Sequence, residues 1–485
     1  MRRLARKRGT TDCYRNPDAR HTSEGRIEPG LAIGLAAGFA FVIAAGGSAA
    51  LRRWLPHFRS AEVKRGAHQI ATPLGVSGKL PLVGGLAAAV AAVVAAALLS
   101  AGPAASSAWW VLAGAAGFFL FGLADDLRKT RVGRGVPEGA YLVIALILSV
   151  GATALVVGPG AHESGAASPY ALAHWLGTGA HVPLSVWYLA LILGTTLATS
   201  FSDGMDGLTP GTVAIATAGA ALAAGIAAGV GHAGWPLGVA AIAAGLLVWN
   251  LPSEWSPANR GANRRASIYI GDSGALMLGA ASAAAAIVAG VDLLWPLIAA
   301  PLLLEGLSSL LQAKILVPLY RRWRDPRLSD GSPVPHQRFP LPLLASPLHY
   351  HWEIVGLNRQ KIVLGFWAGT LATAGLCAIA AAMLESAWAA LAIALAAAVG
   401  AAFWGVATWT RPAFVAADGD FLLLYHGRPI SFLGWLLARR RRVVGDADAV
   451  RAAADGGLLD RPMNAHVLDA TLEELLADDA KRLGT

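Results

Sequence analysis

The 485-residue chain is 55% hydrophobic and only 14% charged, against about 25% charged in soluble domains. Its mean hydropathy is +0.53 and its formal net charge is +9. This composition excludes an ordinary soluble enzyme and predicts an all-α, polytopic helical bundle in a membrane. The two cysteines, Cys13 and Cys377, have no spacing for a zinc knuckle or a disulfide framework.

Apolar stretches long enough to cross roughly 30 Å of hydrocarbon recur along most of the chain, and they are rich in Ala and Gly. The eleven predicted membrane helices lie near 31–49, 80–101, 108–124, 140–158, 184–201, 211–231, 234–250, 274–291, 293–317, 362–384 and 387–409. We divide the chain into a basic tail (1–29), a transmembrane domain (30–385), an additional helix (386–409) and a cytoplasmic extension (410–485).

Lys and Arg are distributed unevenly between the two predicted sides of the membrane. After residue 50 they all fall on one side, which the positive-inside rule assigns to the cytoplasm. The basic tail 1–28 disagrees, because an odd number of helices places it outside. Either a helix is miscounted, or the tail is tolerated outside, or translation starts further on.

Four polar clusters follow or precede apolar stretches, all on the predicted cytoplasmic side. Each alone has an ordinary explanation: a solvated helix end, a Gly-rich turn, a helix N-cap or an interfacial aromatic belt. Their joint occurrence on one side favours function, because carboxylates at membrane depth cost free energy. The clusters are "ADDLRK" with Asp125, Asp126 and Lys129, "SDGMDG" with Asp203 and Asp206, "IYIGDSG" with Asp272, and "SPLHYHWE" with His349, His351 and Glu353.

Carboxylates and cations at a membrane surface suit a diphosphate substrate. Mg²⁺ is commonly held by one or two carboxylates together with substrate phosphates. Basic side chains such as Lys129 and Arg134 neutralise phosphate oxygens. No P-loop pattern is present in the sequence, which argues against an ATP-driven machine. We therefore expect a cytosolic donor to meet a lipid acceptor here.

In order and spacing, these motifs resemble those of the polyprenyl-phosphate hexose-1-phosphate transferases of glycosyltransferase family 4, most closely the phospho-N-acetylmuramoyl-pentapeptide transferase (MraY) branch. "DDLRK" is similar to that family's aspartate pair with a lysine three positions on, and "DGMDGL" to its "DGLDGL". "YIGDSGALMLG" resembles "FMGDTGSLALG", "EGLSSLLQ" resembles "ETLSVILQ", and "SPLHYHWEIVG" resembles "APLHHHFEKKG". The resemblance runs from roughly residue 30 to 385.

The resemblance implies a role for each matching residue. Asp272 would coordinate Mg²⁺, and Asp125, Asp126 and Lys129 would lie near the metal and the lipid phosphate. Asp206 would contact the uracil ring and Tyr269 would stack on it. The remaining substrate-binding residues implied are Asp203, Asn250, His349, His351, Glu353 and Arg134.

The implied reaction is transfer of phospho-N-acetylmuramoyl-pentapeptide from its UDP donor to undecaprenyl phosphate, forming lipid I and releasing UMP in peptidoglycan biosynthesis. The expected place is the bacterial cytoplasmic (inner) membrane, with the site facing the cytoplasm. The resemblance also suggests a homodimer, and no nucleic-acid partner is expected. Because the acceptor phosphate has a second pKa of about 6, a general base adds little, so Asp125 is expected to act mainly as part of the electrostatic frame.

Two other functions stay open. A related enzyme would transfer N-acetylglucosamine-1-phosphate instead, and an inactive scaffold or a transporter would tolerate neutral substitution of the aspartates. Three residues depart from the family pattern: Ser200 replaces Asn, Tyr350 replaces the middle histidine and Gly365 replaces an arginine. In the extension, "ISFLGWLLARRRR" is typical of a membrane-interface segment or a stop-transfer charge cluster, and 469–482 favours an amphipathic helix.

Overall fold

A computed structural model gives the structure of the chain. It describes residues 28–55, 81–100, 105–251, 266–324, 343, 346–354, 357, 359–383, 412–418, 420–432, 435–455, 457–459, 463–464, 468 and 472.

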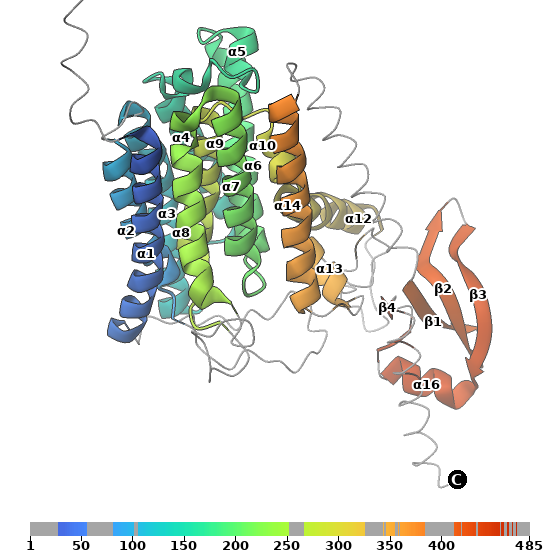
Figure 1. Cartoon of the computed structure of the whole chain (residues 1–485). Coiled ribbons are helices and arrows are strands. Elements are labelled where there is room, and N and C mark those ends of the chain that lie inside the picture. Colours follow the sequence, from blue (N-terminus) through green and yellow to red (C-terminus); the bar gives the residue numbers. More distant parts are fainter. Residues whose placement is uncertain are drawn as a thin grey trace, which may run out of the picture.

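Most described residues form a bundle of long helices that run roughly alongside one another (Figure 1). The long helices are α1 (Pro29–Trp54), α2 (Gly84–Leu99), α3 (Ala105–Val132), α4 (Glu138–Val157), α6 (His181–Ser202), α7 (Leu208–Ala228), α8 (Gly234–Asn250), α9 (Gly271–Val288), α11 (Ala300–Ser309) and α14 (Arg359–Met383). Shorter elements are η2 (Ala161–Gly165), α5 (Leu172–Leu176), η3 (Val230–Ala233), α10 (Trp295–Ile298), η5 (Leu310–Leu316), α12 (Val317–Arg324) and α13 (Leu348–Ile354).

The predicted membrane helices are confirmed wherever the structure describes them. Nine helical spans among the described residues are long and apolar enough to cross a membrane, and α2 is a shorter apolar helix. The predicted helix at 387–409 and residues 1–27 of the basic tail lie outside the described residues. The predicted helix at 293–317 is not one regular α-helix. It begins as α10, continues as α11 and then widens into the π-helix η5, which a hydropathy pattern does not reveal.

Helix α9 is the central element of the bundle, and every residue from Gly271 to Val288 is buried. Its Gly, Ala and Ser residues let neighbouring helices approach closely, as small residues do in membranes. A Cβ on Gly279 would lie 2.2 Å from Thr199 Oγ1 of α6, and one on Gly122 of α3 would lie 2.5 Å from the Asp272 carbonyl. Helix α9 therefore holds its first turn, which carries Asp272, in a fixed place between α3 and α6.

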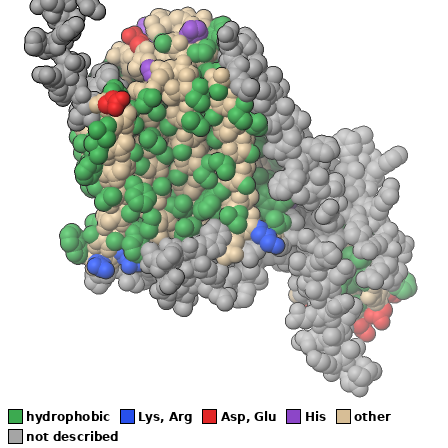
Figure 2. Space-filling view, viewed as in Figure 1, with side chains coloured by type: hydrophobic (Ala, Val, Ile, Leu, Met, Phe, Trp, Pro, Cys, Tyr) green, Lys and Arg blue, Asp and Glu red, His purple; other side chains and the backbone are tan. Residues whose placement is uncertain are grey.

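The lateral surface of the bundle is mainly hydrophobic, and its two ends differ in charge (Figure 2). The view shows Lys and Arg at the end where α1 finishes with Arg52 and Arg53. Histidine and acidic side chains gather at the other end. This distribution agrees with the orientation that the sequence predicts.

The C-terminal extension contains a four-stranded antiparallel sheet with the order β3-β2-β1-β4. Its strands are β1 (Pro412–Asp418), β2 (Phe421–Phe432), β3 (Trp435–Gly445) and β4 (Met463–Asn464), and α16 (Ala447–Asp455) follows β3. The described residues of the stretch 430–442 belong to β2 and β3. A membrane-interface or stop-transfer role of this stretch stays a prediction. Phe432 of β2 and Trp435 of β3 are register partners in this antiparallel pair. Most of the predicted helix at 469–482 lies outside the described residues.

Candidate active site

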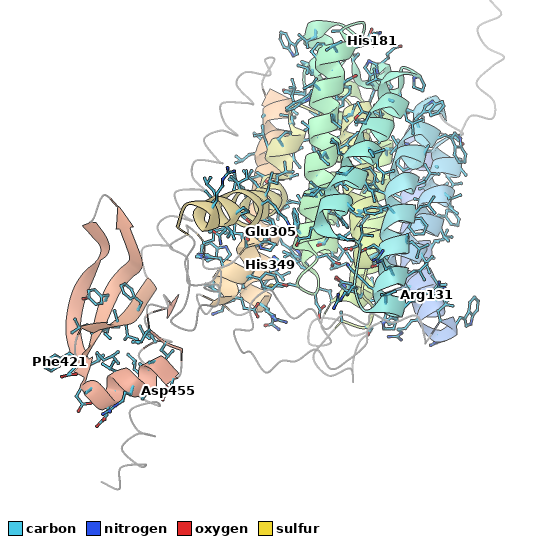
Figure 3. The ribbon with its side chains drawn as sticks, turned by 180° about the vertical axis from the view of Figure 1, so that it is seen from behind. Arg131, His181, Glu305, His349, Phe421 and Asp455 are labelled. Carbon is cyan, nitrogen blue, oxygen red and sulfur yellow. The ribbon has the colours of Figure 1, made fainter. Side chains whose placement is uncertain are left out.

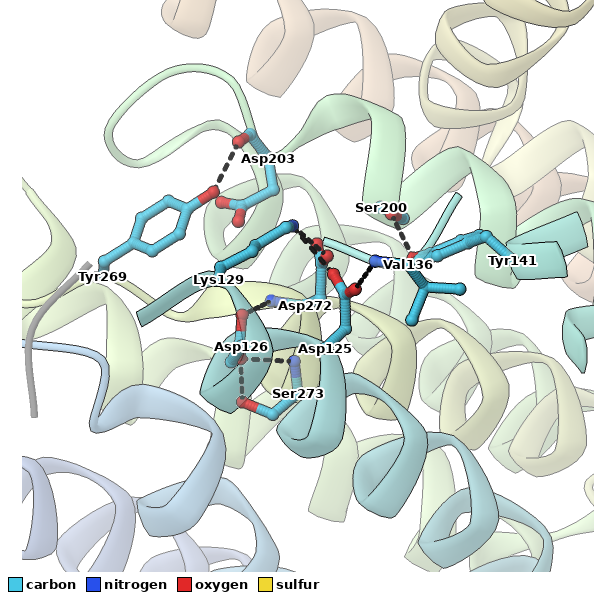
Figure 4. Close-up of polar contacts among 10 residues, drawn as sticks. All are labelled: Asp125, Asp126, Lys129, Val136, Tyr141, Ser200, Asp203, Tyr269, Asp272 and Ser273. Carbon is cyan, nitrogen blue, oxygen red and sulfur yellow. Dashed lines mark hydrogen bonds and ion pairs between the residues drawn. The ribbon is translucent and has the colours of Figure 1, made fainter. Parts of the chain in front are cut away.

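The predicted aspartates meet where the C-terminal turns of α3 approach the first turn of α9 (Figure 4). Asp125 and Asp126 are neighbours on α3, so their side chains leave the helix about 100° apart. One points toward Lys129 and the other toward the start of α9. The two adjacent aspartates therefore have different surroundings.

Asp126 caps helix α9 from a neighbouring helix. Its Oδ1 accepts the backbone N–H of Asp272 at 3.1 Å, and its Oδ2 accepts the N–H of Ser273 at 3.0 Å and the Ser273 hydroxyl at 2.8 Å. The residue before α9, Ile270, offers no capping side chain, so the carboxylate of Asp126 satisfies donors that every helix start leaves open. Its negative charge is also stabilised by the positive end of the α9 helix dipole.

Gly271 makes this cap possible. Its φ is +68°, a left-handed conformation that glycine adopts readily. A Cβ at this position would lie 2.5 Å from Asp126 Oδ2, so a side chain would push the capping carboxylate away. The glycine in "IGDSG" therefore sets both the backbone turn and the contact that fixes Asp272.

Asp125, Lys129 and Asp272 form a cluster of ion pairs. Lys129 Nζ lies 2.6 Å from Asp272 Oδ2 and 2.9 Å from Asp125 Oδ2. The backbone N–H of Val136 donates to Asp125 Oδ1 at 2.5 Å. Asp125 and Lys129 are four residues apart on α3, which places them on one face of the helix. One ammonium group thus lies between carboxylates from two helices.

A second group of predicted residues fixes the loop between α6 and α7. Asn250 accepts the N–H of Gly207 at 2.8 Å and donates to the carbonyl of Ile268 at 3.1 Å. Asp206 Oδ2 accepts the N–H of Ala266 at 3.0 Å. Asn250 and Asp206 therefore tie the 203–207 loop to the segment that leads into α9.

Tyr269 completes this link, because its hydroxyl donates to the carbonyl of Asp203 at 3.3 Å. Burial, together with the nearby carboxylates of Asp203 and Asp272, raises the pKa of Tyr269 well above its ordinary value. The hydroxyl therefore stays protonated and acts as a donor. The expected stacking of Tyr269 and the expected uracil contact of Asp206 stay predictions.

The histidine motif lies on α13. His349 and His351 are both buried, and His351 makes an edge contact with Trp352. Glu353 pairs with Arg359 at 2.6 Å, so the structure places its carboxylate against the start of α14. Arg134 is exposed in the turn between α3 and α4. Hydrogen bonds and ion pairs bring Asp125, Lys129 and Asp272 into one cluster and link Asp126 to it through α9, whereas Glu353 is engaged elsewhere.

Comparison with known proteins agrees with this geometry. Residues 108–290, which include the whole aspartate cluster, match glycosyl transferase family 4. Over 273 residues the chain is 30% identical to the phospho-N-acetylmuramoyl-pentapeptide-transferase of Heliobacterium modesticaldum, an alignment that covers 54% of this chain and 72% of that protein. The chain belongs to glycosyl transferase family 4.

Other relatives with the same name match over shorter spans. The protein from Chlorobium chlorochromatii is 32% identical over 39% of this chain and 47% of its own length. The one from Synechococcus sp. is 29% identical over 52% of this chain and 64% of its own length. The chain thus spans about half the length of the Chlorobium relative. The resemblance that the motifs indicated is confirmed.

The donor set of this family member fits Mg²⁺. Asp125 and Asp272 both face Lys129 Nζ, so their oxygens already converge on a position that a cation occupies. Among the described residues no three His, Cys, Asp or Glu side chains form a metal-binding group. Mg²⁺ takes one or two carboxylates from a protein and completes its coordination with water and substrate phosphates. Asp125 and Asp272 would hold the ion, whereas the three hydrogen bonds of Asp126 fix its two oxygens at the start of α9.

Sequence reasoning missed two neighbours of the site. Glu305 of α11 lies against His349; it begins the family-like motif "EGLSSLLQ" and is an acidic residue inside an apolar stretch, but the sequence assigned it no role. Tyr141 of α4 shares a hydrogen bond of 3.0 Å with Ser200 of α6 at the edge of the cluster (Figure 4). Nothing in the local sequence singles out Tyr141, because its partner lies 59 residues away.

Proposed function

We propose that this chain transfers phospho-N-acetylmuramoyl-pentapeptide from its UDP-linked donor to undecaprenyl phosphate, forming lipid I and releasing UMP. The observation that carries the proposal is the placement of Lys129 between Asp125 and Asp272 at one end of a membrane bundle. Family membership and the names of the similar proteins support the donor and the acceptor. The Lys and Arg at this end support a site that faces the cytoplasm.

In the proposed reaction an oxygen of the lipid phosphate attacks the sugar-linked phosphorus of the donor. A new P–O bond forms there, the bond to the bridging oxygen of the diphosphate breaks, and UMP leaves with that oxygen. The acceptor phosphate has a second pKa of about 6, so it is largely dianionic at neutral pH and needs no strong base. The larger barrier is the approach of two anions.

The residues of the site lower this barrier by charge and position. Lys129 Nζ can donate to oxygens of either phosphate, and its two carboxylate partners fix where the ammonium stands. Asp126 accepts the backbone N–H of Asp272 at the start of α9. This contact keeps the Asp272 carboxylate beside that of Asp125. Mg²⁺ held by Asp125 and Asp272 would neutralise the charge that develops on the diphosphate.

The experiment is UMP release by purified protein in detergent with Mg²⁺ and undecaprenyl phosphate. Wild type is compared on UDP-N-acetylmuramoyl-pentapeptide and on UDP-N-acetylglucosamine, with Asp272→Asn beside it. Asp292→Asn is the matched control, because Asp292 is a buried aspartate at the other end of the bundle. We expect release from the pentapeptide donor, loss in Asp272→Asn, retention in the control and loss on chelation of Mg²⁺. Release from UDP-N-acetylglucosamine alone would assign the chain to the related enzymes that transfer N-acetylglucosamine-1-phosphate. No release from either donor would refute the proposal.

A further inference from the structure

A buried acidic residue lies inside the apolar helix α11. Glu305 is fully buried within the membrane span Ala300–Leu319. Its carboxylate Oε1 contacts Nδ1 of His349, which is also fully buried, and accepts the backbone N–H of His349 at 3.3 Å (Figure 3). Ionisable side chains at membrane depth are costly and tend to mark function.

Stability alone does not account for this pair. Within the described part of the chain, Glu305 Oε2 and His349 Nε2 are buried and have no hydrogen-bond partner. A buried polar pair with unsatisfied atoms is often less stabilising than two apolar side chains of the same volume. The pair therefore points to a positional role that an apolar contact would not supply.

The histidine ring lies directly on the loop between α6 and α7. A Cβ on Gly204 would stand 2.3 Å from His349 Nε2 and 3.0 Å from the Tyr350 hydroxyl. Only a residue without a side chain leaves room for the ring here. Gly204 lies between Asp203 and Asp206, in the loop that Asn250 fixes from the other side.

The opposite end of the pair is fixed to α6, the helix that leads into this loop. A Cβ on Gly306, next to Glu305, would lie 2.7 Å from Ala198 of α6. Helix α11 is therefore held against α6 only a short distance before the loop begins. The Glu305 carboxylate, anchored in this way, sets the place of the His349 ring, and the ring sets the place of Gly204.

We propose that Glu305 and His349 are positioning residues that hold the 203–207 loop in the shape that binds the UDP-linked donor. His349 acts through the loop and not by touching the donor. The part that concerns donor binding rests on the proposed function, whereas the effect on the loop does not.

The first test is Glu305→Gln, which keeps the side-chain shape and one acceptor oxygen but replaces the other carboxylate oxygen with an amide nitrogen. Hydrogen exchange of peptides covering 203–208 should become at least about fivefold faster, with no change in peptides from α9. The KM for the UDP-linked donor should rise about tenfold, while kcat and the KM for the lipid phosphate stay within about twofold. Glu163→Gln, on the exposed surface of η2, is the matched control and should change none of these values.

A double-mutant cycle separates positioning from direct contact. The double variant Glu305→Gln/His349→Gln should be no more impaired than the more impaired single variant, because the two side chains act as one unit. Gly204→Ala provides an independent test, since it changes neither Glu305 nor His349 but forces the His349 ring and residue 204 apart. It should give the same rise in KM for the donor.

The outcomes distinguish the two proposals. Faster exchange of the loop without any UMP release by wild type would leave the positioning role standing and remove the proposed reaction. Unchanged exchange of the loop in Glu305→Gln would overturn the positioning role whatever the reaction is. Additive losses in the double variant, with a fall in kcat for His349→Gln alone, would mean that His349 contacts the donor.

Discussion

Replacing Asp126 with asparagine tests whether this residue is a helix cap or a reacting group. The amide oxygen can replace Oδ2 and keep both contacts with Ser273, but the amide nitrogen then faces the backbone N–H of Asp272. One buried hydrogen bond to a charged acceptor is lost and one buried donor is left without a partner. Hydrogen bonds to charged groups contribute about 1.5–3 kcal/mol and a buried unpaired donor costs about 1–3 kcal/mol; because both figures concern the same lost contact and overlap, we expect a loss of about 2–4 kcal/mol.

The matched variant is Asp125→Asn, one residue away on the same helix. It keeps an acceptor for the Val136 N–H and leaves the cap of α9 intact, and Lys129 keeps Asp272 as a partner. Because the acceptor for Val136 and one carboxylate partner of Lys129 are kept, its stability should change much less than that of Asp126→Asn.

The assays are thermal unfolding in detergent and UMP release. For Asp126→Asn we expect a midpoint lower by about 3–8 °C together with lost activity. For Asp125→Asn we expect an unchanged midpoint and activity reduced at least about 100-fold, as for removal of a group that stabilises developing charge. Equal midpoints for both variants would show that Asp126 does not cap α9.

Three further expectations concern packing, pH and charge. Gly122→Ala places a methyl group 2.5 Å from the backbone of α9 and should abolish UMP release, whereas Gly151→Ala, which meets nothing within 4 Å, should leave it unchanged. Burial raises the pKa of Asp292 to about 7, so the stability that this group contributes is complete below the unfolded carboxyl pKa of about 4 and is lost as pH rises to about 7. A thermal-unfolding series from pH 5 to 8 should therefore decline in wild type and be flatter in Asp292→Asn. Lys129→Gln should lower kcat at least about 100-fold, because it leaves two facing carboxylates without their cation, and retained turnover would contradict the charge argument.

Much of the fold and the centre of the site could be predicted from the sequence. The spans were visible because each crosses the membrane once and must be apolar along its length. The meeting of Asp125 and Asp272 followed from placing both at helix ends on one side, and Lys129 was singled out by its charge and its match to the family motif. The predicted helix ended at residue 124, whereas α3 continues to Val132 and so carries Asp125 and Lys129 on one face. Sequence order alone gave no distances, but the side of the membrane reduced the possible neighbours to a few loops.

The parts that could not be predicted depend on partners far apart in the chain. The capping role of Asp126 requires the start of α9, which lies 146 residues away. The partner of Glu305 lies 44 residues away on a short helix. The hairpin of β2 and β3 was missed because its leucines and arginines have the composition of an interfacial segment, and only strand pairing tells the two apart.

The departures from the family pattern are accommodated around the reactive cluster and leave its centre unchanged. Ser200 is short enough for the Tyr141 hydroxyl to reach it, and the Tyr141 ring packs against Phe121 with centroids 5.0 Å apart, one helical turn before Asp125. The polar group that an asparagine would supply at this position is thus replaced by a serine and a tyrosine. Gly365 is exposed, and a Cβ there would meet nothing within 4 Å, so no contact of the cluster depends on it. Because the contacts of Lys129 with both carboxylates involve none of the departing residues, the substitutions are expected to tune substrate binding and not to remove phosphoryl transfer.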